Sequence, residues 1–181
     1  MPRQTPPDAI ALLKQDHRKV EDLFEKFEKA RGEERKQALA REICTELTIH
    51  AMIEEEIFYP ACHGKIDDEP LLDESYVEHD GAKVLISEIM GNVNAHFFEA
   101  KVTVLSEMIK HHVKEEEKRS EGLFAQAKAA GLDVDALGER LMARKRQLEE
   151  QFATGRLPPA HTRSFTGHTL VQDKPLHTTA A

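Results

Sequence analysis

The stretch HAMIEEEIFYP, residues 50–60, places three consecutive glutamates inside an apolar run. Apolar residues such as Leu47 and Ile57 recur around it every three or four positions, which is the period of one buried helix face. His50 and Glu54 fall on that same face, where aliphatic side chains are expected. Because an unpaired carboxylate is costly to bury, Glu54 requires a partner inside the protein core.

The pattern occurs twice in the chain, with an offset of 62 residues. In each copy a second histidine follows the first by 33 residues, and a glutamate follows the second histidine by four. All six residues lie on the apolar stripes of their predicted helices. The two sets are His17, His50 and Glu54, and His79, His112 and Glu116. An internal repeat of this kind identifies the six side chains as a functional set without any alignment.

The apolar periodicity predicts an all-α protein, an up-down-up-down antiparallel four-helix bundle with an additional C-terminal helix and a flexible tail. We expect the bundle within residues 1–130, with its fourth helix ending just before Gly131. The additional helix is expected within 131–152, packed on or beside the bundle. Residues 153–181 are rich in Pro, Thr, Gly and His without a sustained period, which predicts a largely disordered tail.

The repeat also locates the turns of the two helical hairpins, because facing residues in a hairpin are equidistant from its turn. The midpoint of His17 and His50 falls beside Gly32. The midpoint of His79 and His112 falls at residues 95 and 96, so the third helix should run through Gly91 and turn between residues 94 and 97.

Four histidines and two glutamates at one level of a bundle predict a dinuclear metal centre. No Lys or Arg lies on these stripes to neutralise the carboxylates, whereas a divalent cation would do so. Imidazole suits Zn, Cu, Fe and Ni, and a carboxylate can bridge two ions. With two histidines for each metal and both Glu54 and Glu116 free to bridge, positions stay open for a small molecule, which favours redox or gas chemistry over a closed structural site.

Other polar residues are weaker candidates. Glu55 and Glu56 are expected to be solvated, although one flanking glutamate has room to enter the outer shell of the site, and Tyr59 is expected mainly to fill the core. The residues expected at the surface, at turns or in the tail are His63, His96, His111, His161, His168 and His177. Cys44 is expected to be inert.

Composition excludes several kinds of partner. The formal charge is -8 with acidic and basic residues interspersed, so we expect neither a nucleic-acid nor a membrane partner. No apolar run approaches the roughly 20 residues of a transmembrane helix, and no secretory signal is evident. Cys44 and Cys62 form no disulfide framework, which favours a reducing cytoplasm. The expected partner is a small diatomic ligand or peroxide, and any protein partner is left open.

The sequence resembles the hemerythrin-like, HHE cation-binding family. The resemblance lies in DHRKVEDLF, HAMIEEEIFYP, EHDGAKVLI and HHVKEEE, in the family's order, over roughly residues 8–125. It implies two iron ions in a non-haem di-iron centre with an oxo or hydroxo bridge. The implied terminal ligands are the four histidines, and Glu54 and Glu116 would bridge. Oxygen-carrying members have a fifth histidine where this chain has Lys83, so the ligand set is more similar to di-iron proteins that repair iron centres.

These observations leave several functions open. The first is a di-iron protein that reacts with O2, peroxide or nitric oxide in sensing or in the response to oxidative or nitrosative stress. The second is an enzyme that decomposes peroxide, and the third is a protein that stores or donates iron for the repair of iron centres. A bundle that binds no metal and only contacts other proteins is the fourth.

Overall fold

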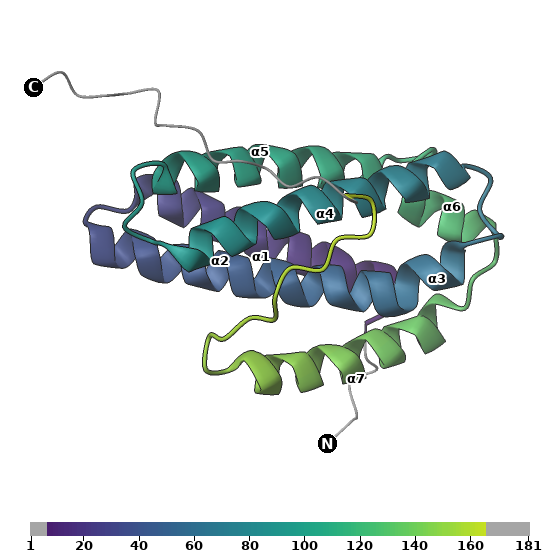
Figure 1. Cartoon of the computed structure of the whole chain (residues 1–181). Coiled ribbons are helices and arrows are strands. Elements are labelled where there is room, and N and C mark those ends of the chain that lie inside the picture. Colours follow the sequence, from purple (N-terminus) through teal and green to yellow (C-terminus); the bar gives the residue numbers. More distant parts are fainter. Residues whose placement is uncertain (1–6, 166–181) are drawn as a thin grey trace, which may run out of the picture.

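The computed structural model describes residues 7–165, and every regular element in that range is helical (Figure 1). Four long helices form the bundle, and shorter elements extend it. In chain order the elements are α1 (Ala9–Lys29), α2 (Glu33–Ile53), the π-helical segment η1 (Glu54–Phe58), α3 (Tyr59–Cys62), α4 (Glu69–Gly91), α5 (Phe98–Glu117), α6 (Leu123–Ala129) and α7 (Val134–Phe152). The predicted all-α bundle is confirmed.

Aspartate side chains define where three of these helices begin. The carboxylate of Asp8 accepts a hydrogen bond from the backbone N–H of Ala11 at 2.7 Å, and Asp133 caps α7 in the same way. Asp68 does so at the start of α4, where Pro70 occupies the first turn. Such caps satisfy backbone donors that no helical carbonyl can reach, and they fix the register in which each helix presents its residues to the core.

The hydrophobic core is divided into two clusters, and the layer of predicted ligands lies between them. One cluster joins the start of α1 and the end of α2 to helices α6 and α7, and Phe58 and Leu141 are fully buried in it. The other joins the four long helices at the end of the bundle that carries the two hairpin turns, and it includes the fully buried Ile43 and Leu105. Burial of these side chains stabilises the bundle on both sides of the polar layer, so that layer is held between two packed blocks.

Both predicted turns are present. Helix α1 ends at Lys29 and α2 begins at Glu33, on either side of Gly32, whose φ of 87° lies in the left-handed region that favours glycine. Helix α4 runs through Gly91, and α5 begins at Phe98. The second turn therefore lies within residues 92–97, as the repeat predicted.

The expectation of one fourth helix continuing to Gly131 is wrong. Helix α5 ends at Glu117, and α6 starts after Gly122. A Cβ atom at Gly122 would lie only 2.5 Å from the carbonyl oxygen of Glu116, so the reversal of the chain brings two backbone segments together where only glycine fits. The break turns α6 back over the bundle and stacks Phe124 on the imidazole of His17, with ring centroids 5.8 Å apart.

Residues 153–165 make specific contacts, although we expected a disordered tail from residue 153. They contain no helix beyond α7 and pass across α2 toward α4 (Figure 1). The backbone N–H groups of Arg163 and Ser164 donate to Asp80 of α4, each at 2.6 Å. We call residues 155–164 the strap. The remainder of the expected tail, 166–181, lies outside the described residues.

Within residues 7–165, no helix is both long enough and apolar enough to cross a membrane.

Helix α7 packs against α1 and α2, and the packing depends on Gly138. A Cβ atom there would lie 2.4 Å from the carbonyl oxygen of Pro7 and 2.9 Å from the backbone nitrogen of Ala9.

We predict that Gly138→Ala lowers the free energy of unfolding by about 1–3 kcal/mol through overpacking, measured by urea denaturation. The control is Gly91→Ala, because no heavy atom lies within 4 Å of its added Cβ. Equal stability of the two variants would contradict close packing of α7.

Candidate metal centre

The six predicted residues come together at one level of the bundle, and all six side chains are buried. The Nε2 atoms of His17 and His50 are 3.1 Å apart, and those of His79 and His112 are 3.2 Å apart. An oxygen of Glu54 lies 3.1 Å from His50 and 3.3 Å from His79, so this carboxylate spans both histidine pairs. The hairpin repeat therefore converges on a single polar cluster.

The donor atoms form two groups, each compact enough to hold a metal ion. The first group contains His17, His50, Glu54 and Glu116, and the second contains Glu54, His79 and His112. Within each group the donor atoms lie within 4.8 Å of one another. Glu54 belongs to both groups, which is the arrangement expected of a carboxylate between two ions.

The unpaired atoms of the cluster fit a metal better than a network of hydrogen bonds. Glu54 Oε1 and Glu116 Oε2 are buried and find no hydrogen-bond partner among residues 7–165. In that same range the ion-pair partners of these two carboxylates are all histidines. The carboxylates are hard ligands and the converging imidazoles are intermediate ones, and both kinds bind divalent cations. A cation here would also satisfy the free lone pairs of the buried carboxylates.

The pKa values of the cluster also favour a bound cation. Burial alone would raise the pKa of Glu54, but His50 and His79 outweigh it and hold that pKa well below its usual range. Burial would lower the pKa of His50, yet Glu54 and Asp16 raise it to about 10. Glu54 and Glu55 likewise raise the pKa of His79 to about 9 against the effect of burial. Without a metal, protons on His50 and His79 would thus supply the positive charge that a metal otherwise provides.

Each histidine turns its other ring nitrogen to a carboxylate. His17 Nδ1 lies 2.8 Å from Glu117, His79 Nδ1 lies 3.1 Å from Glu55, and His112 Nδ1 lies 2.7 Å from Glu78. His50 Nδ1 is farther from its carboxylate, at 3.7 Å from Asp16. Outer carboxylates of this kind hold the ring orientation and increase the basicity of the inward-facing Nε2.

The four outer carboxylates obey the same repeat as the ligands. Asp16 and Glu78 each precede the first histidine of a set, and Glu55 and Glu117 each follow the glutamate, again 62 residues apart. Our expectation that Glu55 is a solvated acid is wrong, because its side chain is only 8% exposed. The offset that identified the ligands also identifies these carboxylates, since each neighbours a ligand in sequence and contacts a histidine of a different helix.

Basic residues lie behind three of these carboxylates. Lys83 Nζ lies 2.7 Å from Glu55, and an Arg18 nitrogen lies 2.7 Å from Glu117. Lys145 of α7 forms an ion pair with Asp16, so the additional helix takes part in the outer shell of the site. The charge of the acidic layer is therefore balanced from outside the histidines.

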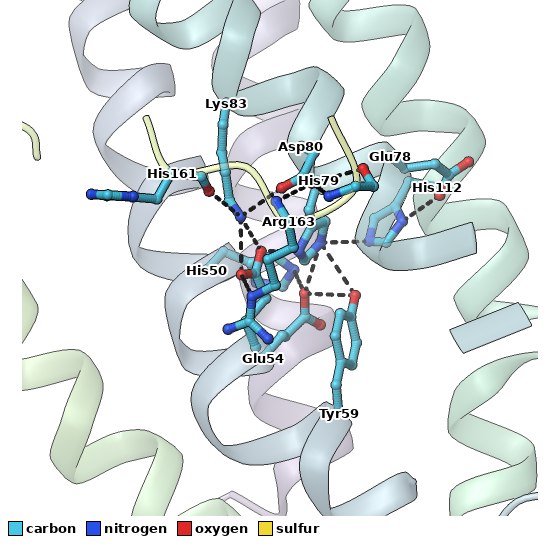
Figure 2. Close-up of polar contacts among 12 residues, drawn as sticks. His50, Glu54, Tyr59, Glu78, His79, Asp80, Lys83, His112, His161 and Arg163 are labelled. Atoms are coloured by element: carbon cyan, nitrogen blue, oxygen red, sulfur yellow. Dashed lines mark hydrogen bonds and ion pairs between the residues drawn. The ribbon is translucent and has the colours of Figure 1, made fainter. Parts of the chain in front are cut away.

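The π-helical segment η1 brings a seventh side chain into the cluster. Glu54 precedes Tyr59 by five residues, and the wider π turn places both on the same side of the helix. The fully buried Tyr59 hydroxyl lies 3.3 Å from Glu54 and 3.2 Å from His79 Nε2 (Figure 2), and 3.1 Å from Glu116. Regular α-helical geometry would instead align Tyr59 with Glu55, which is why the sequence predicts Tyr59 mainly as a core residue.

The other histidines and Cys44 lie away from the cluster. His63 is exposed and contacts Glu69, and His111 is exposed and lies 3.5 Å from Glu78. His96 lies in the second hairpin turn. Cys44 is buried, and burial raises the pKa of its thiol to about 12, as expected of an inert cysteine. His161 lies in the strap, whereas His168 and His177 fall outside the described residues.

A cavity of about 960 Å³ adjoins the cluster. It reaches the four histidines at one end and extends between α2 and α4 beneath the strap. Small molecules therefore have space to approach the histidines without rearrangement of the bundle.

Comparison with known proteins agrees with this geometry. A solved hemerythrin HHE cation-binding domain-containing protein from Mycobacterium kansasii is similar in structure, with a TM-score of 0.66 and 24% sequence identity. The similarity covers 82% of this chain and 91% of that one, and at this identity it supports the fold alone. A DNA nickase from Nostoc sp. (strain PCC 7120 / SAG 25.82 / UTEX 2576) is 30% identical over 110 residues. That alignment covers 59% of this chain but only 30% of the nickase, so the chain matches less than a third of that relative.

The family comparison covers the whole candidate centre. The sequence pattern that defines the hemerythrin HHE cation-binding domain matches residues 8–123, which include all six predicted ligands and Tyr59. The chain therefore belongs to the hemerythrin HHE cation-binding domain family, whose members bind metal cations.

Proposed function

We propose that the protein holds two iron ions in a non-haem centre that reacts with O2, peroxide or nitric oxide, in sensing or in the response to oxidative or nitrosative stress. One observation carries the proposal. The buried donors form two groups that share Glu54, and a cavity connects this cluster to the surroundings. A purely structural metal site would enclose its ion with protein ligands and leave no such approach.

The composition of the cluster favours iron over ions that prefer other donors. Four imidazoles and two carboxylates offer intermediate and hard ligands, with no thiolate among them. Four-helix bundles commonly hold di-iron centres with carboxylates and histidines from facing helices. Bound iron would supply the electrons that are exchanged with the small molecule.

The chain's own residues orient the centre and manage its charge. Glu117, Glu55 and Glu78 hold three imidazoles in place through Nδ1, which leaves Nε2 directed inward. Lys83 occupies the position where oxygen-carrying relatives have a fifth histidine, and its ammonium contacts Glu55 rather than the cluster. The second donor group thus has only two imidazoles, with the Tyr59 hydroxyl beside it.

Metal content provides the direct test. We predict two iron ions per chain in protein purified from iron-supplemented cells, measured by elemental analysis. Glu54→Gln keeps the side-chain size but removes the shared carboxylate, so its iron content should fall to about one or fewer. The matched control is Glu56→Gln, because Glu56 is exposed and contacts Arg144 of α7. Two ions in both variants would contradict a bridging role for Glu54.

Exposure of the reduced, iron-loaded protein to O2, peroxide and nitric oxide in turn should give a new visible absorption with at least one of them. No change with any of the three would overturn the proposal. Catalytic release of oxygen from peroxide would identify a peroxide-decomposing enzyme. Rapid transfer of iron to an apo acceptor, without such a reaction, would instead identify iron donation.

Tyr59 should modify the centre without being required for the fold. Tyr59→Phe keeps the buried ring but removes the hydroxyl that contacts Glu54, His79 and Glu116. We predict about tenfold weaker retention of metal and an altered visible spectrum of the ferric protein, measured by chelator competition and absorption. Tyr76→Phe is the control, since Tyr76 packs on the Tyr59 ring at 5.1 Å between centroids. Identical spectra for Tyr59→Phe and the native chain would show that the hydroxyl does not act on the metals.

Metal binding should tighten as pH rises. In the metal-free protein the pKa of His50 is about 10 against an ordinary 6.5, so the stability gained from its proton is complete below 6.5 and is lost as pH approaches 10. A metal displaces such protons, and its apparent affinity should rise about tenfold per pH unit for each one released.

The difference in melting temperature between metal-loaded and metal-free protein should therefore widen between pH 6.5 and 9. Differential scanning fluorimetry measures both forms. His63→Ala is the control, because His63 pairs with Glu69 at the surface. A difference that stays constant over this range would contradict the linkage.

A further inference from the structure

The cavity beside the cluster is far larger than the small molecules considered so far require. Its volume is about 960 Å³. A molecule the size of water occupies about 30 Å³ in the liquid, and diatomic gases and peroxide are of similar order. Pockets that bind organic ligands typically measure roughly 300–1,000 Å³. The cavity thus has the size of an organic-ligand site.

The walls of the cavity are mainly apolar. Val20 of α1, Leu47 of α2, Ile86 of α4 and Val113 of α5 line it, so all four bundle helices contribute. Most of the charged groups along it are held in ion pairs: Lys83 and Arg163 pair with Glu55, Asp16 pairs with Lys145, and Glu56 pairs with Arg144 of α7. A lining of this kind favours an uncharged, largely apolar molecule over an ion.

The strap covers the cavity without filling it. Leu157 packs against both hydrophobic clusters, and the strap then continues as Pro158 and Pro159 along the cavity. Two prolines in succession fix an extended backbone that cannot collapse into the space as a helix.

The far end of the strap is anchored to α4 beside a predicted ligand. Asp80 is 1% exposed, and its carboxylate accepts three hydrogen bonds from the strap, from the N–H groups of Arg163 and Ser164 and from the Ser164 hydroxyl. Lys83 Nζ donates to the carbonyl oxygen of His161 at 3.3 Å. Figure 2 shows Lys83 and Asp80 beside the strap above His50, and the Arg163 side chain extending from the strap toward Glu54. The strap is therefore attached to α4 where the cavity meets the donor cluster.

We propose that this cavity binds an uncharged, largely apolar organic molecule next to the metal centre, with the strap closing over it. The inference rests on the volume, lining and roof of the cavity, and it holds whichever metal or small molecule the centre uses. The bound molecule contacts the apolar walls of the four helices at one end and faces the histidines at the other.

The test uses the uncharged fluorescent probe N-phenyl-1-naphthylamine with the full, metal-loaded chain. We expect saturable binding of one probe per chain, with enhanced and blue-shifted emission. The linear alcohols from hexanol to dodecanol should displace it, with an optimum in chain length set by the length of the cavity. Absence of saturable binding, or displacement that depends only on the hydrophobicity of the alcohol, would overturn the proposal.

Two variants connect the binding to this cavity. Ala82→Phe adds a ring at a buried position of the α4 wall, and we expect at least tenfold weaker probe binding. Ala100→Phe is the matched control, because Ala100 is exposed on α5 away from the cavity. Metal content and helical circular dichroism should be equal in both. Weakening by the control to the same extent as by Ala82→Phe would show that the probe binds elsewhere.

A substitution in the strap tests whether the strap closes the cavity, without a change in any bundle helix. Leu157→Trp extends into the cavity from above, so the optimal alcohol should become shorter while the melting temperature of the bundle stays within a few degrees. This variant decides the question if Ala82→Phe fails to fold. An unchanged optimum in Leu157→Trp would mean that the strap does not close the binding site.

Discussion

Burial of two carboxylates without a lysine or arginine beside them is the constraint on which this structure depends. Glu54 and Glu116 lie between two hydrophobic clusters, where water cannot solvate them, and their ionic partners among residues 7–165 are histidines. A charge in such a place has to be matched locally. Protonated imidazoles achieve this in the metal-free chain and two cations would achieve it in the loaded one, so the fold and the metal are parts of one electrostatic balance.

The balance extends outward in layers, and each layer fixes the one inside it. Carboxylates behind the imidazoles orient the rings, and basic residues behind the carboxylates keep the acids ionised and in place. Lys145 comes from α7 and contacts Asp16, while Lys83 and Arg163 approach Glu55 from α4 and the strap. Elements that follow the bundle in sequence are thereby tied to the geometry of its centre, which gives them a role beyond covering apolar surface.

The sequence predicted the bundle, both hairpin turns and the convergence of the six donors, because helical periodicity and an exact repeat are visible in one chain. It did not predict features that depend on particular distances in space. The π turn before Tyr59 leaves the apolar pattern unchanged, and the break before α6 depends on backbone atoms that meet at Gly122. The strap was missed because its anchor, Asp80, lies 83 residues from Arg163, and no pattern in the sequence indicates that the two meet.

The departures from the repeat make the two halves of the centre unequal. The π turn adds Tyr59 beside the pair His79 and His112, and nothing equivalent follows Glu116, because α5 ends one residue later. The asymmetry also reaches the outer shell, where Lys83 connects Glu55 on one side to the strap on the other. Any molecule bound beneath the strap would therefore approach the centre past Glu55 and His79. The side of the centre that contains Tyr59, where the repeat is broken, is thus the side that faces the strap.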